Sequence, residues 1–213
     1  MLVSGLSIGG GVERVCSMLA NELSNSGYEI VLVTLEKSNQ LFFPINKDIK
    51  IFQIQSFFSH SSLGRLPVTA YKIKNIRNTI YRIRNTLCDS PSIAYQLRKI
   101  LKKESVDTII SVDTNLMKIV FPATLGLPIN LIAWEHMNFN VNFGSKSRAI
   151  IKQLCARYSD SIVILTERNK EYWLKGTSHI SQVITIYNAS PFLVQCHIQE
   201  KTKTVLAIGR LTE

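Results

Sequence analysis

The chain opens with LVSGLSIGGGVERVCSMLANELSNSGYEIVLVTL, residues 2–35, and this stretch decides its fold. Two β-branched and aliphatic runs, residues 2–4 and 30–35, flank a triple glycine and a segment with apolar residues at helical spacing. That apolar face comprises Val12, Val15, Cys16, Leu19, Ala20 and Leu23. Gly27 stands where a helix C-terminal cap belongs. The order strand, glycine turn, helix, strand is typical of a parallel βα unit.

The same alternation continues along the chain. Further short apolar runs occupy residues 49–54, 108–112, 129–134, 161–165, 183–186 and 204–208. This pattern predicts an α/β fold with a Rossmann-like, doubly wound, mostly parallel sheet. The last run is followed by Gly209 and Arg210, and the sequence ends three residues later. We therefore expect one domain over residues 1–190, with the crossover and first strand of a truncated second domain over 191–213.

Composition limits the kinds of partner and compartment. With 213 residues and 46% hydrophobic content, the chain can bury a substantial core. Its 25 Lys and Arg against 15 Asp and Glu give a net charge of +10, which favours an anionic partner. The four cysteines are scattered without metal-ligand spacing, so we expect free thiols and no metal site. Without a signal peptide or spanning apolar run, a cytoplasmic location is expected.

The triple glycine lies between the first strand and the first helix. Gly9, Gly10 and Gly11 would let backbone N–H groups approach a phosphate, which predicts an anion cradle. A GxGxxG dinucleotide motif would need glycine where Arg14 stands, and no Lys-Ser/Thr pair follows as in a P-loop. A tight turn without any ligand is the alternative.

Glu135 and His136 directly follow the strand run 129–134. Open α/β sheets bind ligands at the carboxyl ends of their strands, so this position suits a functional residue. From the residues alone, an imidazole there is either a structural hydrogen-bonding group or a catalytic one.

A basic amphipathic segment spans residues 71–87. Isoleucines at spacings of three or four form one apolar face, and its basic residues are Lys72, Lys74, Arg77, Arg82 and Arg84. Such a segment can contact an anionic membrane surface or a lipid diphosphate; an ordinary surface helix is the alternative. Nucleic acid is disfavoured because no aromatic platform or known binding module accompanies the charge.

Several of these segments, taken in order, resemble the family 4 (group 1) glycosyltransferases. They are SIGGGVERV (7–15), LANELSNSGYEIVLVT (19–34), WEH (134–136), SDSIVILTERNKEYW (159–173), ITIYNASPF (184–192) and VLAIGRLTE (205–213). The resemblance implies the N-terminal, acceptor-side half of a GT-B fold. It covers essentially the whole chain and is weakest over residues 42–101.

The resemblance also implies roles for residues. His136 would meet the donor sugar near the reaction centre, and Arg210 would begin the segment that grips the donor diphosphate together with the Gly9–Gly11 turn. Glu13, Glu135 and Asn188 would lie nearby, without an assigned role. Neither a metal nor another cofactor is expected beyond the nucleotide-sugar donor.

The resemblance also implies a retaining hexosyltransferase that acts on a lipid-linked or saccharide acceptor. Its pathway would be the biosynthesis of a bacterial surface polysaccharide such as O-antigen. We expect it to be peripheral at the inner face of the cytoplasmic membrane. The 213-residue chain itself is expected to be inactive alone, because the donor-binding domain with its Glu-x7-Glu element is missing. The alternatives are a non-catalytic binding module that retains the acceptor side, or an unrelated α/β nucleotide- or nucleic-acid-binding domain.

Overall fold

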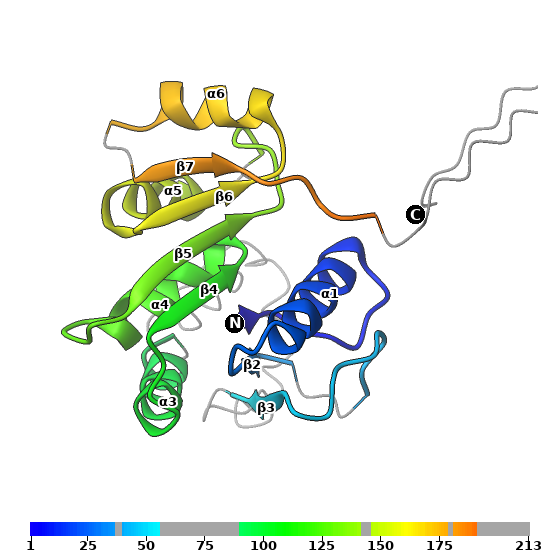
Figure 1. Cartoon of the computed structure of the whole chain (residues 1–213). Helices are drawn as coiled ribbons and strands as arrows, with labels where there is room; N and C mark the ends of the chain where they lie inside the picture. Colours follow the sequence, from blue (N-terminus) through cyan, green and yellow to red (C-terminus); the bar gives the residue numbers. More distant parts are fainter. Residues whose placement is uncertain (37–39, 56–89, 142–145, 179–180, 191–213) are drawn as a thin grey trace, which may run out of the picture.

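The computed structural model describes residues 1–36, 40–55, 90–141, 146–178 and 181–190 (Figure 1). Seven strands form one sheet in the order β3-β2-β1-β4-β5-β6-β7. The strands are β1 (Leu2–Val3), β2 (Val31–Thr34), β3 (Lys50–Gln53), β4 (Thr108–Val112), β5 (Asn130–Glu135), β6 (Ser161–Ile164) and β7 (Gln182–Thr185). Every neighbouring pair is parallel. The predicted Rossmann-like fold is therefore confirmed, and the strand predicted at 204–208 lies outside the described residues.

Helices connect these strands across the sheet. They are α1 (Gly11–Asn25), α3 (Ser90–Lys103), α4 (Met117–Thr124), α5 (Lys146–Tyr158) and α6 (Glu167–Gly176), with a short 3-10 turn η3 (Thr114–Leu116) before α4. Helix α1 ends as its sequence predicts. Gly27 follows the cap residue Ser26 and has φ +89°, a conformation that glycine adopts without strain.

Strand residues alternate between two cores, because successive side chains point to opposite faces of a sheet. Leu32 and Trp134 belong to a core with Cys16 and Ala20 of α1. Their neighbours on the strands belong to the other core. That second core comprises Val33 and Ala133 together with Leu97 of α3, Met117 of α4 and Cys155 of α5. The sheet is thus covered on both faces, with α1 on one side and α3, α4 and α5 on the other.

Two thiols can be placed in this fold. Cys16 and Cys155 are free and buried, one in each core. Burial raises the pKa of Cys16 to about 12, so this group is an inert, protonated thiol at neutral pH. In the part of the chain that the structure describes, no helix is long and apolar enough to cross a membrane.

The strand order changes direction between β1 and β4. From β1 the chain adds β2 and β3 on one side, and then returns to place β4, β5, β6 and β7 on the other. The loops that leave β1 and β4 at their carboxyl ends therefore diverge to opposite faces of the sheet. Open α/β sheets bind their ligands in the crevice at such a switch point. The residues that follow β1, β4 and β5 are consequently the first candidates for a site.

Candidate functional site

His136 is the first residue after β5, at this carboxyl edge. Its half-buried ring lies 4.4 Å from that of Trp134, centroid to centroid. The Nε2 atom is buried and has no hydrogen-bond partner among the described residues. Burial lowers the pKa of His136, with the nearby Asp113 carboxylate acting in the opposite direction. A largely neutral imidazole with an unpaired nitrogen can exchange a hydrogen bond with a ligand hydroxyl.

Glu135 is the last residue of β5, directly before His136, and is completely buried. The Thr114 hydroxyl donates to its Oε2, and the Met137 N–H donates to Oε1 at 2.9 Å. Burial raises the pKa of the Glu135 carboxyl, while these two hydrogen bonds lower it. Both oxygens are thus used inside the protein. Glu135 ties the end of β4 to the chain after His136, which is a positioning arrangement.

Residues 136–141, here called the His136 loop, are held by two buried polar side chains from outside the loop. Asn169 of α6 accepts from the Phe139 N–H at 2.9 Å and donates to the Met137 carbonyl at 3.2 Å. Lys152 of α5, only 1% exposed, donates to the carbonyls of Phe139 and Val141. Burial lowers the pKa of Lys152. The loop backbone is therefore fixed before any ligand arrives, as positioned chemical groups require.

Apolar packing fixes the same loop. The Phe139 ring lies edge-on to Trp173 of α6, with 5.1 Å between the centroids, and Trp173 is fully buried. A Cβ added to Gly176, the last residue of α6, would overlap the Phe139 ring. Gly176 is therefore required by a close approach, since its φ is not among the positive values.

Asp113, the first residue after β4, has a strained backbone. Its φ of +134° is one that residues with a Cβ rarely adopt. Its Oδ1 accepts from the Asn115 N–H at 2.7 Å, and both of its oxygens lie 3.1 Å from the same guanidinium nitrogen of Arg148. Strained residues at ligand-binding edges are typical of functional sites. Asp113 lies at the switch point, beside β1.

Sequence reasoning missed Asp113, Arg148, Lys152 and Asn169. One signal was present: Arg148 and Lys152 occupy the same face of α5 as Cys155, at helical spacing. Charged residues on an apolar helix face indicate buried ion pairs or clamps.

The glycine turn follows β1 on the other side of the switch point. None of Gly9, Gly10 and Gly11 has a positive φ. A Cβ on Gly9 would meet the Phe42 ring at 2.5 Å, and the Glu13 carboxylate lies over Gly10. Close approach of the Phe42 ring therefore explains Gly9, whereas the flexible Glu13 side chain could move away from a Cβ at Gly10.

The residues just before this turn bind an anion inside the protein, the carboxylate of Glu36. The N–H groups of Leu6 and Ser7 donate to its Oε2 at 3.1 and 3.2 Å, and the Ser7 hydroxyl donates to Oε1. These two amides precede the glycines. The phosphate-binding role of the Gly9–Gly11 turn stays a prediction.

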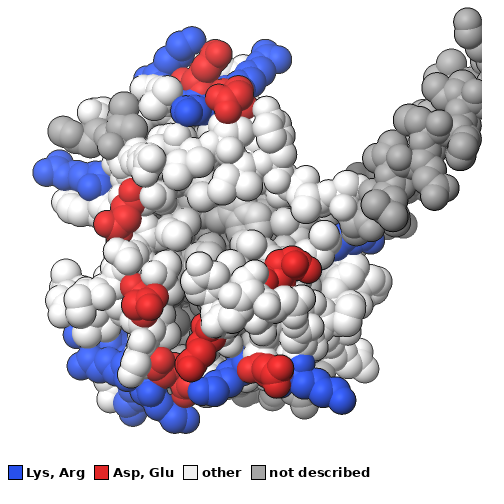
Figure 2. All heavy atoms as spheres, viewed as in Figure 1, with Lys and Arg blue, Asp and Glu red and all other residues white. Residues whose placement is uncertain are grey.

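The remaining predicted residues are scattered or outside the described parts. Asn188 is exposed in the segment after β7. Arg210 and the basic residues Lys72, Lys74, Arg77, Arg82 and Arg84 lie outside the described residues. Figure 2 shows Lys and Arg along the lower edge of one face, where α3 and β3 lie in Figure 1. Part of the positive charge on α3 is structural, because Arg98 donates to the carbonyls of Ala123 and Leu125.

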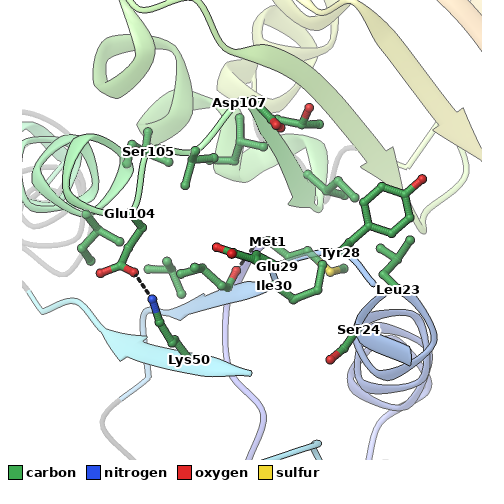
Figure 3. Close-up of a pocket in the computed structure, with 18 of the residues that line it drawn as sticks. Met1, Leu23, Ser24, Tyr28, Glu29, Ile30, Lys50, Glu104, Ser105 and Asp107 are labelled. Atoms are coloured by element: carbon green, nitrogen blue, oxygen red, sulfur yellow. Dashed lines mark hydrogen bonds and ion pairs between the residues drawn. The ribbon is translucent and has the colours of Figure 1, made fainter. Parts of the chain in front are cut away.

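Two cavities lie at opposite edges of the sheet. The larger, about 1140 Å³, is at the amino ends of the strands, where a dashed line in Figure 3 joins Lys50 to Glu104 across 2.7 Å. It is remote from the carboxyl edge, so we do not assign it to the candidate site. The smaller, about 340 Å³, lies at the carboxyl ends of β1, β2 and β3. Among the described residues, no cluster of His, Cys, Asp or Glu could hold a metal ion.

Comparisons with known proteins agree with this architecture. The chain is 29% identical to an uncharacterized glycosyltransferase of Haemophilus influenzae over 98% of its own length and 52% of that protein. It is 25% identical to the amylovoran biosynthesis glycosyltransferase AmsD of Erwinia amylovora, over 100% and 53% of the two chains. The chain thus spans about half the length of these curated relatives.

Solved structures show the same fold. The apo form of the lipopolysaccharide outer core galactosyltransferase WaaB matches with a TM-score of 0.61 and 18% identity, covering 89% of this chain and 45% of that one. Anabaena HepE, solved in complex with UDP and glucose, matches with a TM-score of 0.57 and 10% identity, covering 89% and 44%. The family model described as Glycosyltransferase Family 4 matches residues 9–189. The chain therefore belongs to glycosyltransferase family 4.

Proposed function

We propose that this chain is the N-terminal, acceptor-side half of a retaining glycosyltransferase. The whole enzyme moves a hexose from a nucleotide-diphosphate donor to a lipid-linked or saccharide acceptor. The observation that carries this proposal is His136, whose buried, unpaired Nε2 lies at the carboxyl edge on a loop fixed by Glu135, Lys152 and Asn169. An imidazole held in this way can contact a sugar hydroxyl at the reacting centre.

The charge that develops in this reaction is on the departing diphosphate. Cationic side chains and backbone N–H groups stabilise such charge, and this stabilisation is usually the largest catalytic contribution. In our proposal Arg210 and the Gly9–Gly11 turn supply part of it, and the half of the enzyme beyond residue 213 supplies the rest. In the same proposal Glu13 and Asn188 are neighbours of the diphosphate without an assigned role.

The names of the relatives support the proposed donor and the proposed class of polysaccharide. HepE was solved with UDP and glucose, which supports a nucleotide-sugar donor. AmsD is named for amylovoran biosynthesis, and WaaB for the lipopolysaccharide outer core, which supports a role in bacterial surface polysaccharides. Within that class, O-antigen is the polysaccharide that we propose. The domain division at about residue 190 belongs to the same proposal. A non-catalytic module that retains only the acceptor side is the second candidate.

Turnover by the chain alone separates these candidates from each other. We expect residues 1–213 to transfer no sugar, since most of the diphosphate stabilisation is lacking. A chain extended to the length of its relatives should transfer hexose from a radiolabelled nucleotide sugar to a lipid-linked saccharide. Sugar transfer by the purified 213-residue chain would contradict the claim that residues 1–213 lack most of the diphosphate stabilisation. An inactive extended chain would favour the binding module.

The membrane part of the proposal rests on the basic segment 71–87. Each Lys or Arg close to an anionic surface contributes about 1 kcal/mol of attraction, and salt screens it. The chain should therefore bind vesicles that contain anionic lipid at low salt and leave them as salt rises. Changing Arg77, Arg82 and Arg84 to Gln should weaken this binding in a flotation assay. Binding that the triple substitution leaves unchanged would make these charges an ordinary solvated surface.

A further inference from the structure

The cavity of about 340 Å³ at the carboxyl ends of β1, β2 and β3 has the chemistry of a carbohydrate site. Its polar lining consists of Ser7, Thr34, Glu36, Gln40 and Gln53. Its apolar lining includes Leu41 and Ile51, which are 42% and 38% exposed. A sugar ring also combines hydroxyl groups with apolar C–H faces. The volume is at the lower end of the range of small-molecule sites, about 300–1,000 Å³, and so suits a single small group.

Glu36 is the fixed charge in this cavity. Three donors hold its carboxylate: the N–H groups of Leu6 and Ser7, and the Ser7 hydroxyl. These hydrogen bonds lower the pKa of Glu36, with the Ser7 hydroxyl as the largest cause, so the group is ionised at neutral pH. A carboxylate has about four acceptor positions, and three are used here. Glu36 lines the cavity, and its remaining acceptor position can serve a ligand donor.

The same arrangement disfavours phosphate. Backbone N–H groups at the turn after the first strand are the donors that a phosphate would use, and at Leu6 and Ser7 a carboxylate already occupies them. A second anion beside Glu36 would be repelled and would find those donors taken. The cavity therefore disfavours anionic ligands and suits ligands that donate hydrogen bonds, such as hydroxyl groups.

We propose that this cavity is a saccharide subsite in which the Glu36 carboxylate accepts hydrogen bonds from sugar hydroxyls. The strand order places it three strands from the end of β5, in the sequence β2-β1-β4-β5. With adjacent strands about 4.8 Å apart, roughly 14 Å separate it from His136. The sugar it holds is thus a part of the acceptor away from the newly formed bond. That assignment to the acceptor rests on the proposed function, whereas the binding of a saccharide does not.

The test is an NMR titration of the 15N-labelled 213-residue chain with methyl α-D-glucoside, methyl α-D-galactoside and methyl α-D-mannoside, and separately with inorganic phosphate. At least one glycoside should shift the amide signals of Leu6, Ser7 and Gln53 saturably, and phosphate should leave them in place. Glu36→Gln should weaken glycoside binding by about tenfold or more, since a hydrogen bond to a charged acceptor becomes one to a neutral acceptor. Glu29→Gln removes the same charge at the opposite edge, by the larger cavity, and should bind as the unaltered chain does.

Glutamine can still accept from the Leu6 and Ser7 amides, so the fold should survive, and unchanged amide dispersion verifies this. The proposal is overturned if no glycoside binds saturably, if Glu36→Gln binds equally well, or if phosphate shifts the same amides. If an extended enzyme transfers sugar but no glycoside binds, the results contradict only the subsite. If a glycoside binds but the extended enzyme is inactive, the results contradict the proposed function and support the subsite.

Discussion

At the scale of single residues, the backbone at Asp113 is the most unusual feature of the carboxyl edge. A side chain held at φ +134° costs on the order of 1–3 kcal/mol, and the surrounding contacts must offset that cost. Those contacts are the Asn115 N–H and the Arg148 guanidinium. Because the strained residue lies between the glycine turn and the His136 loop, its carboxylate has a position that no relaxed backbone would give it.

This strain predicts that two substitutions of Asp113 have the reverse of their usual order of stability. Asp113→Ala and Asp113→Gly both remove the carboxylate, but only glycine adopts φ +134° without a Cβ penalty. The glycine variant should therefore be the more stable by about 1 kcal/mol in urea unfolding, although glycine is normally the less stabilising residue. An alanine variant that equals or exceeds the glycine variant would show that the backbone there carries no strain.

At the scale of elements, the His136 loop depends on α5 and α6. Lys152 supplies its ammonium from α5, and Asn169 supplies its amide from α6. Gly176 leaves room for Phe139, which packs against Trp173. Two helices thus position one loop through hydrogen bonds to its backbone and one aromatic contact, and a small displacement of either helix would move His136.

Two glycine substitutions test this dependence as a matched pair. Gly11→Ala, in the first turn of α1, places its Cβ where no atom lies within 4 Å, so it should stabilise the fold by about 0.5–1 kcal/mol. Gly176→Ala gains the same helix propensity but drives its Cβ into Phe139, so it should lose about 1–3 kcal/mol. NMR shifts of the His136 ring should change only in the second variant. Equal stabilisation by both would mean that Phe139 does not hold the loop.

The strands could be predicted from the sequence, and the clamps on the loop could not. The runs that became β4 and β5 are short, mainly apolar and have buried residues on both faces, so they are visible without any tertiary information. Lysine ordinarily marks a surface, yet Lys152 is buried because two loop carbonyls accept from it. Asn169 reaches Met137 across 32 residues of sequence. Long-range partners of this kind leave no local pattern.

The glycine turn shows a similar limit. The position of this turn after β1 could be predicted from the sequence. The hydrogen bonds from the Leu6 and Ser7 N–H groups to Glu36 could not, because Glu36 is 30 and 29 residues away from them. The sequence pattern predicted a loop whose N–H groups bind an anion. The carboxylate that they bind belongs to Glu36, just after β2, and the parallel pairing of β1 and β2 brings it alongside.

At the scale of the whole molecule, the chain belongs to glycosyltransferase family 4 and has the parallel sheet of its structural neighbours. The chain spans 52% and 53% of the lengths of its curated relatives, and in the proposed function it supplies the acceptor side. What this half provides is a rigid carboxyl edge with His136 on one side of the switch point and the Glu36 cavity on the other. The central claim is that this edge serves sugar transfer.

The most direct measurement of that claim is the rate of hexose transfer by a chain extended to the length of its relatives, with and without His136→Ala. A positioned catalytic group typically contributes 10²-fold or more, so the variant should lose at least about that factor. Its melting temperature should fall only slightly, because the ring is half-buried against Trp134 and Nε2 has no hydrogen-bond partner among the described residues. Near-normal transfer by the variant, with an unchanged melting profile, would contradict the account and remove His136 from the site.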